Sequence, residues 1–358
     1  MNRPYPIIDA DCHVIEPLDL WSRYLEPEFS NHCVRGLELD GEPIYHKISG
    51  DLRARGPQLQ ESNHAAYGIT GYDPASVVKA IKLLGSEFAF LYPTFGGWLF
   101  AVDSMDAALA GALVRAYNNW LFDFCGYDRH VLRGVGAINR HAPDEMVPEL
   151  RRIAGFEWRA VALRPNPIKG RLLSDPAYEP FWSECEALGI AVGIHEGTHA
   201  RVPSAGADRF DTRFAMHACS HPMEQMMALL ALIEGGVMER HPRLRFAFLE
   251  AGGGWIPYWL WRLDREYHDL DWEVRGNVTM KPSDYFRRQC FVSVEPTEPY
   301  LGPLMDFIGA DNILIGSDFP HMDHDPNVMN DAIGLEGTLG RATVEKLLWH
   351  NPKRFYGL

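Results

Sequence analysis

The chain has 358 residues and a mass of 40.5 kDa, with 46% hydrophobic and 23% charged residues. This composition is typical of a globular protein and excludes a mainly disordered chain. The formal net charge is −14 and Lys and Arg form no long run, which argues against nucleic acid or an anionic membrane as a partner. No apolar run approaches the roughly 18 residues that a membrane span needs.

Eight short apolar or β-branched runs end abruptly in polar, Gly or Pro residues, and we expect them to be strands. They cover residues 7–13, 88–92, 132–138, 160–163, 190–195, 245–250, 291–294 and 313–317. Helical stretches separate them, and this alternation indicates a parallel sheet that is buried on both faces. Eight such units predict the α/β fold of a (β/α)8 TIM barrel, which has about 250 residues before insertions.

Residues 28–75 interleave Gly, Pro, Asn and charged residues without a sustained period. We expect them to be a long insertion after the first strand that caps the barrel mouth. No internal repeat or flexible linker divides the chain, so residues 1–358 are expected to form a single domain. Further along, Pro222 is expected to open a buried, almost wholly apolar helix that ends at Gly235.

The cysteines are scattered, form no C-x-x-C pair, and follow an N-terminus without the apolar core of a signal peptide. We therefore expect free thiols and a cytoplasmic protein. The six residues are Cys12, Cys33, Cys125, Cys185, Cys219 and Cys290.

Three polar residues alternate along the first predicted strand. Asp9, Asp11 and His13 lie two residues apart, so they share one face of an extended chain. If that face lines the barrel, Asp11 and His13 project together at its mouth and could chelate a divalent metal. The alternative is that Asp9 caps a turn and His13 is a hydrogen-bonded core residue.

Four later strands also end in potential metal ligands, namely His195 followed by Glu196, then Glu250, Glu295 and Asp318. Buried acids and imidazoles need partners, and a metal ion supplies the missing positive charge. Further histidines on the adjoining loops exceed what one metal ion can use. They are His199, His217, His221, His321 and His324.

Five stretches of the sequence resemble one family: IIDADCH, GIH, HPMEQMMALLALIEGGVMERHPRLRFAFLEAGGGWIPYW, GSDFPH and NPKRFYGL. They are similar to the amidohydrolase-related branch of the amidohydrolase superfamily, which includes aminocarboxymuconate semialdehyde decarboxylase and γ-resorcylate decarboxylase. The resemblance covers the chain apart from residues 28–75. It implies a (β/α)8 barrel with Asp11, His13, His195 and Asp318 as ligands of a first metal, where Asp11 replaces the first histidine of the usual H-x-H.

One departure counts against decarboxylation by the usual route of that family. Its decarboxylases carry a histidine just before the Gly-rich turn after strand six, where it activates the metal-bound water. Here Ala251 occupies that place and Glu250 precedes it, so that base is absent.

A second departure is the additional donor set of His221, Glu250 and His321. These residues could complete a second metal site, with the Glu250 carboxylate bridging two ions. Strand four offers no lysine for the carbamylated bridge of other binuclear amidohydrolases. The arrangement resembles the amidohydrolase-fold non-haem diiron monooxygenases of platensimycin and platencin biosynthesis.

The donor surplus favours a dinuclear, diiron enzyme that hydroxylates a hydrophobic small molecule with O2. Its expected catalytic residues are Glu250, Asp318 and His321. The alternative is a Zn- or Mn-dependent hydrolase or decarboxylase of a small carboxylated substrate that uses metal-bound water. A third interpretation, a non-catalytic metal-binding protein, is disfavoured because structural sites do not need donors from five strands. The sequence leaves open whether the chain forms a homo-oligomer.

Overall fold

The structure is a computed structural model that describes residues 5–32, 38–39, 42–43, 64–196, 204–321 and 324–358. Its strands are β1 (Ile8–His13), β2 (Glu38–Leu39), β3 (Glu42–Pro43), β4 (Phe88–Tyr92), β5 (Leu132–Gly134), β6 (Gly136–Ala137), β7 (Ala160–Leu163), β8 (Ala191–His195), β9 (Phe246–Leu249), β10 (Cys290–Ser293) and β11 (Ile313–Leu314).

The helices of the first half are α1 (Leu20–Tyr24), α4 (Pro74–Leu84), α5 (Phe95–Leu99), α6 (Ala107–Cys125), α7 (Pro143–Gly155) and α8 (Glu179–Leu188), with short 3-10 turns η1 (Pro27–His32) and η3 (Pro176–Tyr178). The second half has α9 (Arg213–Glu234), α10 (Val237–Arg240), α11 (Trp255–Val274), α12 (Pro282–Gln289), α13 (Leu301–Ile308), α14 (Val328–Gly334), α15 (Glu336–Leu339), α16 (Arg341–Glu345) and α17 (Asn351–Tyr356), with the 3-10 turn η4 (Ala310–Asn312) and the π-helical turn η5 (Lys346–His350).

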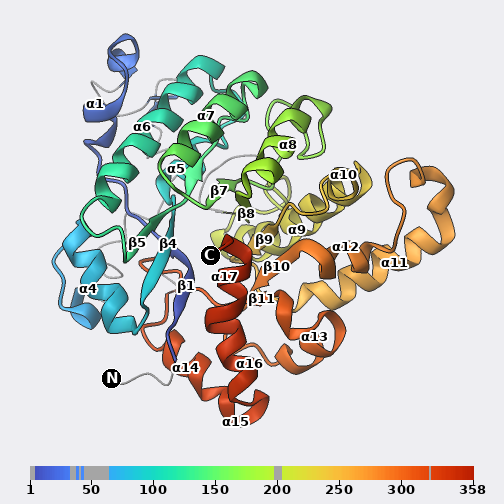
Figure 1. Cartoon of the computed structure of the whole chain (residues 1–358). Helices are drawn as coiled ribbons and strands as arrows, with labels where there is room; N and C mark the ends of the chain where they lie inside the picture. The colour runs from blue at the N-terminus through green and yellow to red at the C-terminus, as the bar shows by residue number, and fades with distance from the viewer. Residues whose placement is uncertain (1–4, 33–37, 40–41, 44–63, 197–203, 322–323) are drawn as a thin grey trace.

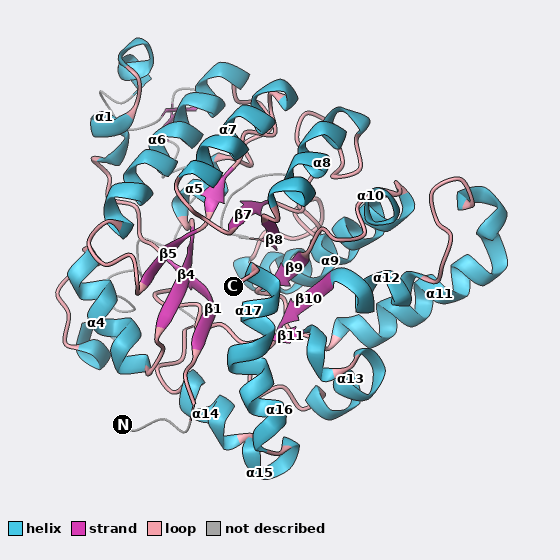
Figure 2. Cartoon of the chain, viewed as in Figure 1, coloured by secondary structure: helices cyan, strands magenta, loops and turns pink. Residues whose placement is uncertain are grey.

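The strands form a parallel barrel surrounded by helices, as Figures 1 and 2 show. Two sheets make up the barrel, one with the order β1-β4-β5 and one with the order β6-β7-β8-β9-β10-β11, while β2 and β3 form a separate antiparallel pair. Between β5 and β6 lies only Val135, whose N–H donates to the carbonyl of Leu91 at 3.1 Å. At the other junction the Ala10 N–H donates to the Ile315 carbonyl (3.3 Å) and the Asp318 N–H to the Asp11 carbonyl (2.8 Å). The predicted TIM barrel and its eight strands are confirmed.

The barrel interior is filled by alternating small and aromatic side chains, because each strand points every second residue inward. This inner cluster comprises Ile8, Ala10, Phe90, Tyr92, Val135, Ala160, Ala191, Ala247, Leu249, Phe291 and Leu314, with Phe355 and Tyr356 from α17. The hydroxyl of Tyr356 donates to the Ala10 carbonyl at 2.7 Å, so the C-terminal helix is tied to β1.

The helix predicted to open at Pro222 begins nine residues earlier, at Arg213, and contains the proline in its interior. Thr212 caps it by accepting a hydrogen bond from the Ala215 N–H, a local signal that the proline obscured. The expected full burial is also wrong, since Met223 and Met227 are 47% and 48% exposed. Gln225 faces the barrel instead, where its amide donates to the carbonyls of Ile194 in β8 and Leu249 in β9.

The proposed cap over residues 28–75 lies largely outside the described residues and stays a prediction, as does the single domain. At the end of that segment the Tyr67 hydroxyl lies 2.5 Å from Nε2 of His324, in the loop after β11. None of the described helices is long and apolar enough to cross a bilayer. The five described cysteines are free thiols, and Cys33 lies outside the described residues.

Candidate metal centre

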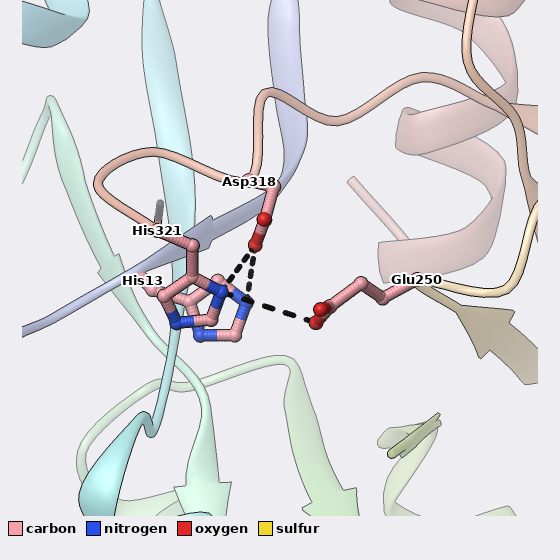
Figure 3. A group of neighbouring side chains, drawn as sticks. All are labelled: His13, Glu250, Asp318 and His321. Carbon is pink, nitrogen blue, oxygen red and sulfur yellow. Dashed lines mark ion pairs between the residues drawn. The ribbon is translucent and has the colours of Figure 1, made fainter. Parts of the chain in front are cut away.

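The carboxyl ends of β1, β8, β9 and β11 bring five side chains of the predicted metal site together: Asp11, His13, His195, Glu250 and Asp318. His13 Nε2 lies 3.6 Å from Asp11 Oδ1 and 3.3 Å from Asp318 Oδ1. His195 Nε2 lies 3.5 Å from Asp11 Oδ1 and 3.1 Å from Glu250 Oε2. Figure 3 shows Asp318 and Glu250 directed at the imidazoles of His13 and His321.

His13 and His195 are both oriented by backbone carbonyls. His13 Nδ1 lies 3.2 Å from the Pro93 carbonyl, and His195 Nδ1 lies 2.7 Å from the Glu196 carbonyl. A carbonyl only accepts, so Nδ1 carries a proton in both rings, and Nε2, on the side of the carboxylates, is the nitrogen whose lone pair a metal can use. This is how a protein sets the tautomer of a metal-binding histidine.

The donor set fits a divalent cation. Asp11 Oδ1, His13 Nε2, His195 Nε2 and Glu250 Oε2 are fully buried and make no well-aligned hydrogen bond within the described residues. Ligands bound about 2.1 Å from one ion are roughly 3.0–3.5 Å apart, close to the separations of Asp11 Oδ1 from the two histidine Nε2 atoms. A cation held by Asp11, His13 and His195 would therefore satisfy three buried polar atoms at once.

The titration of these groups reflects the crowding of charges. Burial raises the pKa of Asp11, whereas burial and the nearby His321 and His195 hold the pKa of His13 well below its usual range. Burial alone would lower the pKa of His195, but the carboxylates of Asp11, Glu250 and Asp318 outweigh it and raise the pKa to about 9. Glu250 is buried among histidines that keep its pKa well below normal.

Two of the site carboxylates sit on strained backbone. Glu250 and Asp318 both have φ of +54°, a left-handed conformation that residues other than glycine rarely adopt. Such conformations cluster at functional sites, where the surrounding fold maintains them. Asp9 helps to maintain the backbone beside Asp318, because its Oδ1 accepts a hydrogen bond from the Ser317 N–H at 2.8 Å. Burial raises the pKa of Asp9 to about 7.

His321, predicted to bind a second metal, already has two polar partners. Its Nδ1 lies 2.6 Å from Asp318 Oδ1 and its Nε2 lies 2.8 Å from the Thr94 hydroxyl. Thr94 carries no sequence signal and was missed. His321 is thus placed to orient Asp318, although it also belongs to a group with His13, Glu250 and Asp318 that could hold an ion.

His221 does lie beside Glu250, with 3.3 Å between His221 Nε2 and Glu250 Oε1. One turn earlier on α9, His217 stacks on it with ring centroids 4.2 Å apart. These three residues form a separate group that could hold a metal. The sequence marked His217 as a loop histidine and left it out of the ligand set, whereas in the structure it lies on α9.

The remaining predicted donors are not in the cluster. Glu295, after β10, is exposed, and no described metal-binding group includes it. The ring of His324 bonds instead to the Ser317 carbonyl and Tyr67. His199 lies outside the described residues.

The profile of the amidohydrolase family matches residues 89–358. This chain belongs to the amidohydrolase family. Its sequence is 26% identical to the 2-amino-3-carboxymuconate-6-semialdehyde decarboxylase of Dictyostelium discoideum over 74% of this chain and 70% of that protein. It is also 26% identical to the γ-resorcylate decarboxylase of Rhizobium radiobacter, over 71% and 78% of the two chains. The expected branch of the superfamily is therefore confirmed.

Solved structures show the same fold. An amidohydrolase of Mycobacterium avium subsp. paratuberculosis superposes with a TM-score of 0.79 at 23% identity, covering 99% of this chain and 100% of the other. The 5-carboxyvanillate decarboxylase of Novosphingobium aromaticivorans, determined with bound manganese, gives 0.74 at 18% identity, covering 100% and 98%.

The expectation of a diiron monooxygenase was wrong. The relatives with assigned activities are decarboxylases of carboxylated substrates, which supports the alternative interpretation. The error came from the surplus of donors, which was counted without knowing their partners. In the structure, His321 bonds to Asp318 and Thr94, so a count of histidines overstated the evidence for redox iron.

Proposed function

We propose that this amidohydrolase is a divalent-metal-dependent decarboxylase that acts on a small aromatic carboxylate. The carrying observation is that Asp11, His13 and His195 bring buried polar atoms together in one group that could hold a metal, with Glu250 Oε2 3.1 Å from His195 Nε2. The activities of the relatives and the manganese in a structural neighbour supply the reaction class and metal type. Manganese or zinc fits this mixed set of carboxylate and imidazole ligands.

A metal held by Asp11, His13 and His195, with Glu250 as a further ligand, would orient the substrate and withdraw charge from it. Loss of CO2 leaves the electron pair of the broken C–C bond on the ring carbon, which must then receive a proton. Asp318 and His321, 2.6 Å apart, are the pair placed to hold that proton. The Thr94 hydroxyl fixes the far side of the His321 ring.

The test is CO2 release from a panel of hydroxylated benzoates by protein loaded with Mn²⁺. We expect at least one substrate to lose CO2, and Asp318→Asn to lower the rate by about 100-fold or more, the scale of a general acid. Asn tolerates the left-handed conformation of position 318, so the variant should remain folded. No CO2 from any aromatic carboxylate would contradict the proposal.

We further propose a second divalent ion held by His217, His221 and Glu250, so that Glu250 bridges two sites. One carboxylate oxygen faces His195 and the other faces His221, as bridging requires. Two histidines four residues apart on one helix face commonly bind one metal ion together. In this proposal His217, and not the predicted His321, completes the second metal site.

Elemental analysis of fully loaded protein tests the second ion. We expect two ions per chain in the wild type and one in His217→Ala, while His130→Ala, an exposed control, keeps two. A single ion in the wild type would contradict the second site and leave the first intact.

We propose a small molecule as the binding partner of the protein. The free thiols of the described cysteines support a reducing, cytoplasmic environment. We also propose self-association, because α9 and α11 pack together and expose large apolar side chains. They are Met223, Met227, Tyr258 and Trp261.

A further inference from the structure

A hollow lies at the amino ends of the barrel strands, on the face opposite the metal centre. Its lining includes Phe90 of β4, Leu132 and Arg133 of β5, Phe122 of α6 and residues 156–159, which precede β7. We call it the basal hollow. Chemistry in a TIM barrel takes place at the carboxyl ends of the strands, so a ligand in the basal hollow would occupy a separate site.

The basal hollow has room for a small ring. Its volume is about 240 Å³, whereas an engineered apolar cavity of about 150 Å³ in another protein is enough for benzene. It shares no lining residue with the hollow at the metal centre, to which Asp11, Glu250 and Asp318 belong.

One wall of the basal hollow is aromatic. The ring centroids of Phe122 and Phe156 lie 4.4 Å apart, and those of Phe156 and Trp158 lie 5.2 Å apart. Phe122 and Phe156 are partly exposed, so their rings are accessible to a ligand. Trp158 is fixed behind them, because its indole occupies the space where Gly134 has no Cβ. A flat ligand ring can stack on such a wall.

Three arginines, Arg129, Arg133 and Arg159, line the same hollow, and Glu157 is the one acidic side chain among its described lining residues. Arg129 and Arg159 are exposed and Arg133 is half-buried. The guanidinium carbon of Arg129 lies 4.6 Å from the ring centroid of Phe122. None of the three arginines forms an ion pair or a hydrogen bond with another residue in the described part of the chain.

The arginines make this region positive in a chain whose formal net charge is −14. Arg245 extends the cluster, because burial and then the nearby Arg159 lower its pKa. The arginines outnumber the acidic groups even when the α-carboxylate of Leu358, another lining residue, is counted with Glu157. Guanidinium groups without acidic partners suit the oxygens of a carboxylate or a phosphate.

We propose that the basal hollow is a second binding site, specific for an aromatic carboxylate. The ring stacks on the wall of Phe122 and Phe156, and the carboxylate pairs with the arginines of the lining. The aromatic wall favours a ring-bearing anion over inorganic phosphate, which offers charge alone. The site needs no metal and does not depend on the proposed decarboxylase function.

Calorimetric titration of the full chain with benzoate, before and after a chelator removes Mn²⁺, tests the site. We expect about one benzoate per chain to bind after chelation, when no cation at the metal centre attracts it. Benzamide has the same ring without the charge and should bind about tenfold more weakly. Inorganic phosphate lacks the ring and should also bind about tenfold more weakly.

The double variant Arg133→Met, Arg159→Met keeps the apolar stems of both side chains and removes their charges. It should bind benzoate at least about tenfold more weakly than wild type. The matched control is Arg265→Met, Arg275→Met, which removes the same charge from α11, across the molecule from α6 and α7 in Figure 1. The control should keep the wild-type affinity within about twofold.

The single variant Arg159→Met changes only an exposed side chain, so it provides the measurement if the double variant does not fold. It should weaken benzoate binding about threefold or more.

Absence of benzoate binding after chelation overturns the proposal, and so does wild-type affinity in the folded arginine variant. Equal binding of benzamide would reject recognition of the charge, and phosphate binding as tight as that of benzoate would reject recognition of the ring. CO2 release plays no part in these measurements, so failure of the proposed decarboxylase and failure of this site are distinguishable.

Discussion

At the scale of single residues, the site depends on side chains that are buried before any ligand arrives. Glu16 is an example outside the metal cluster. Its carboxylate accepts from the N–H groups of Thr94, Phe95 and Gly96 at 3.0–3.1 Å and so fixes the segment that carries Thr94. Burial outweighs these hydrogen bonds and raises the pKa of Glu16 to about 7.

This pKa predicts a pH dependence of stability. The unfolded chain loses the Glu16 proton near pH 4.5 and the folded chain near pH 7, so the free energy of unfolding falls as pH rises between them. The loss amounts to about 3 kcal/mol at most. Urea unfolding from pH 4.5 to 7.5 should show a flatter profile for Glu16→Gln. The exposed control Glu28→Gln should follow the wild type, and an unchanged slope in Glu16→Gln would refute the assignment.

At the scale of elements, the close approach of β1 and the segment after β11 sets the position of Asp11. A Cβ atom on Gly316 would lie 2.3 Å from the Asp11 Cβ and 2.8 Å from its backbone N and O. The backbone cannot move aside as a flexible side chain would. Glycine is therefore required where the two ends of the barrel sheet meet.

We expect Gly316→Ala to lower the free energy of unfolding by about 1–3 kcal/mol through overpacking and to weaken metal binding by displacing Asp11. The matched control is Gly302→Ala on α13, where nothing lies within 4 Å of the added methyl. That helical substitution should stabilise the protein by about 0.5–1 kcal/mol. Chemical unfolding and metal titration of both variants measure the two effects. Wild-type metal affinity in Gly316→Ala would argue against this packing constraint.

At the scale of the whole molecule, the metal centre joins strands from both halves of the barrel. Asp11 and His13 come from one sheet, while His195 and the residues after β9 and β11 belong to the other. A bound cation would neutralise repulsion among their carboxylates and link the two sheets. Metal binding should therefore stabilise the fold itself.

We expect chelation to lower the melting temperature by several degrees and Mn²⁺ to restore it, because a ligand at 100 times its Kd stabilises the folded state by about 2.7 kcal/mol. Differential scanning calorimetry of His13→Ala provides the control, since that variant should gain little from Mn²⁺. An equal gain in both proteins would place the stabilising ion elsewhere.

The sequence by itself determined the barrel, its eight strands and the donors at their ends. Buried parallel strands must be continuous apolar runs, so an Asp, His or Glu at the end of one stands out without knowledge of its neighbours. The same local signals located Asp11, His13, His195, Glu250 and Asp318. Counting these donors also led to the wrong reaction class, because the sequence does not show which other side chains each donor contacts.

Tertiary structure decided how those donors are used. His321 bonds to Asp318 and Thr94, His217 stacks on His221 along α9, and Arg164 pairs with the buried Glu196. Each of these relations joins groups whose approach depends on how helices and loops pack around the barrel. The energy of a buried polar group is set by the partner it meets in space, which sequence spacing alone does not specify.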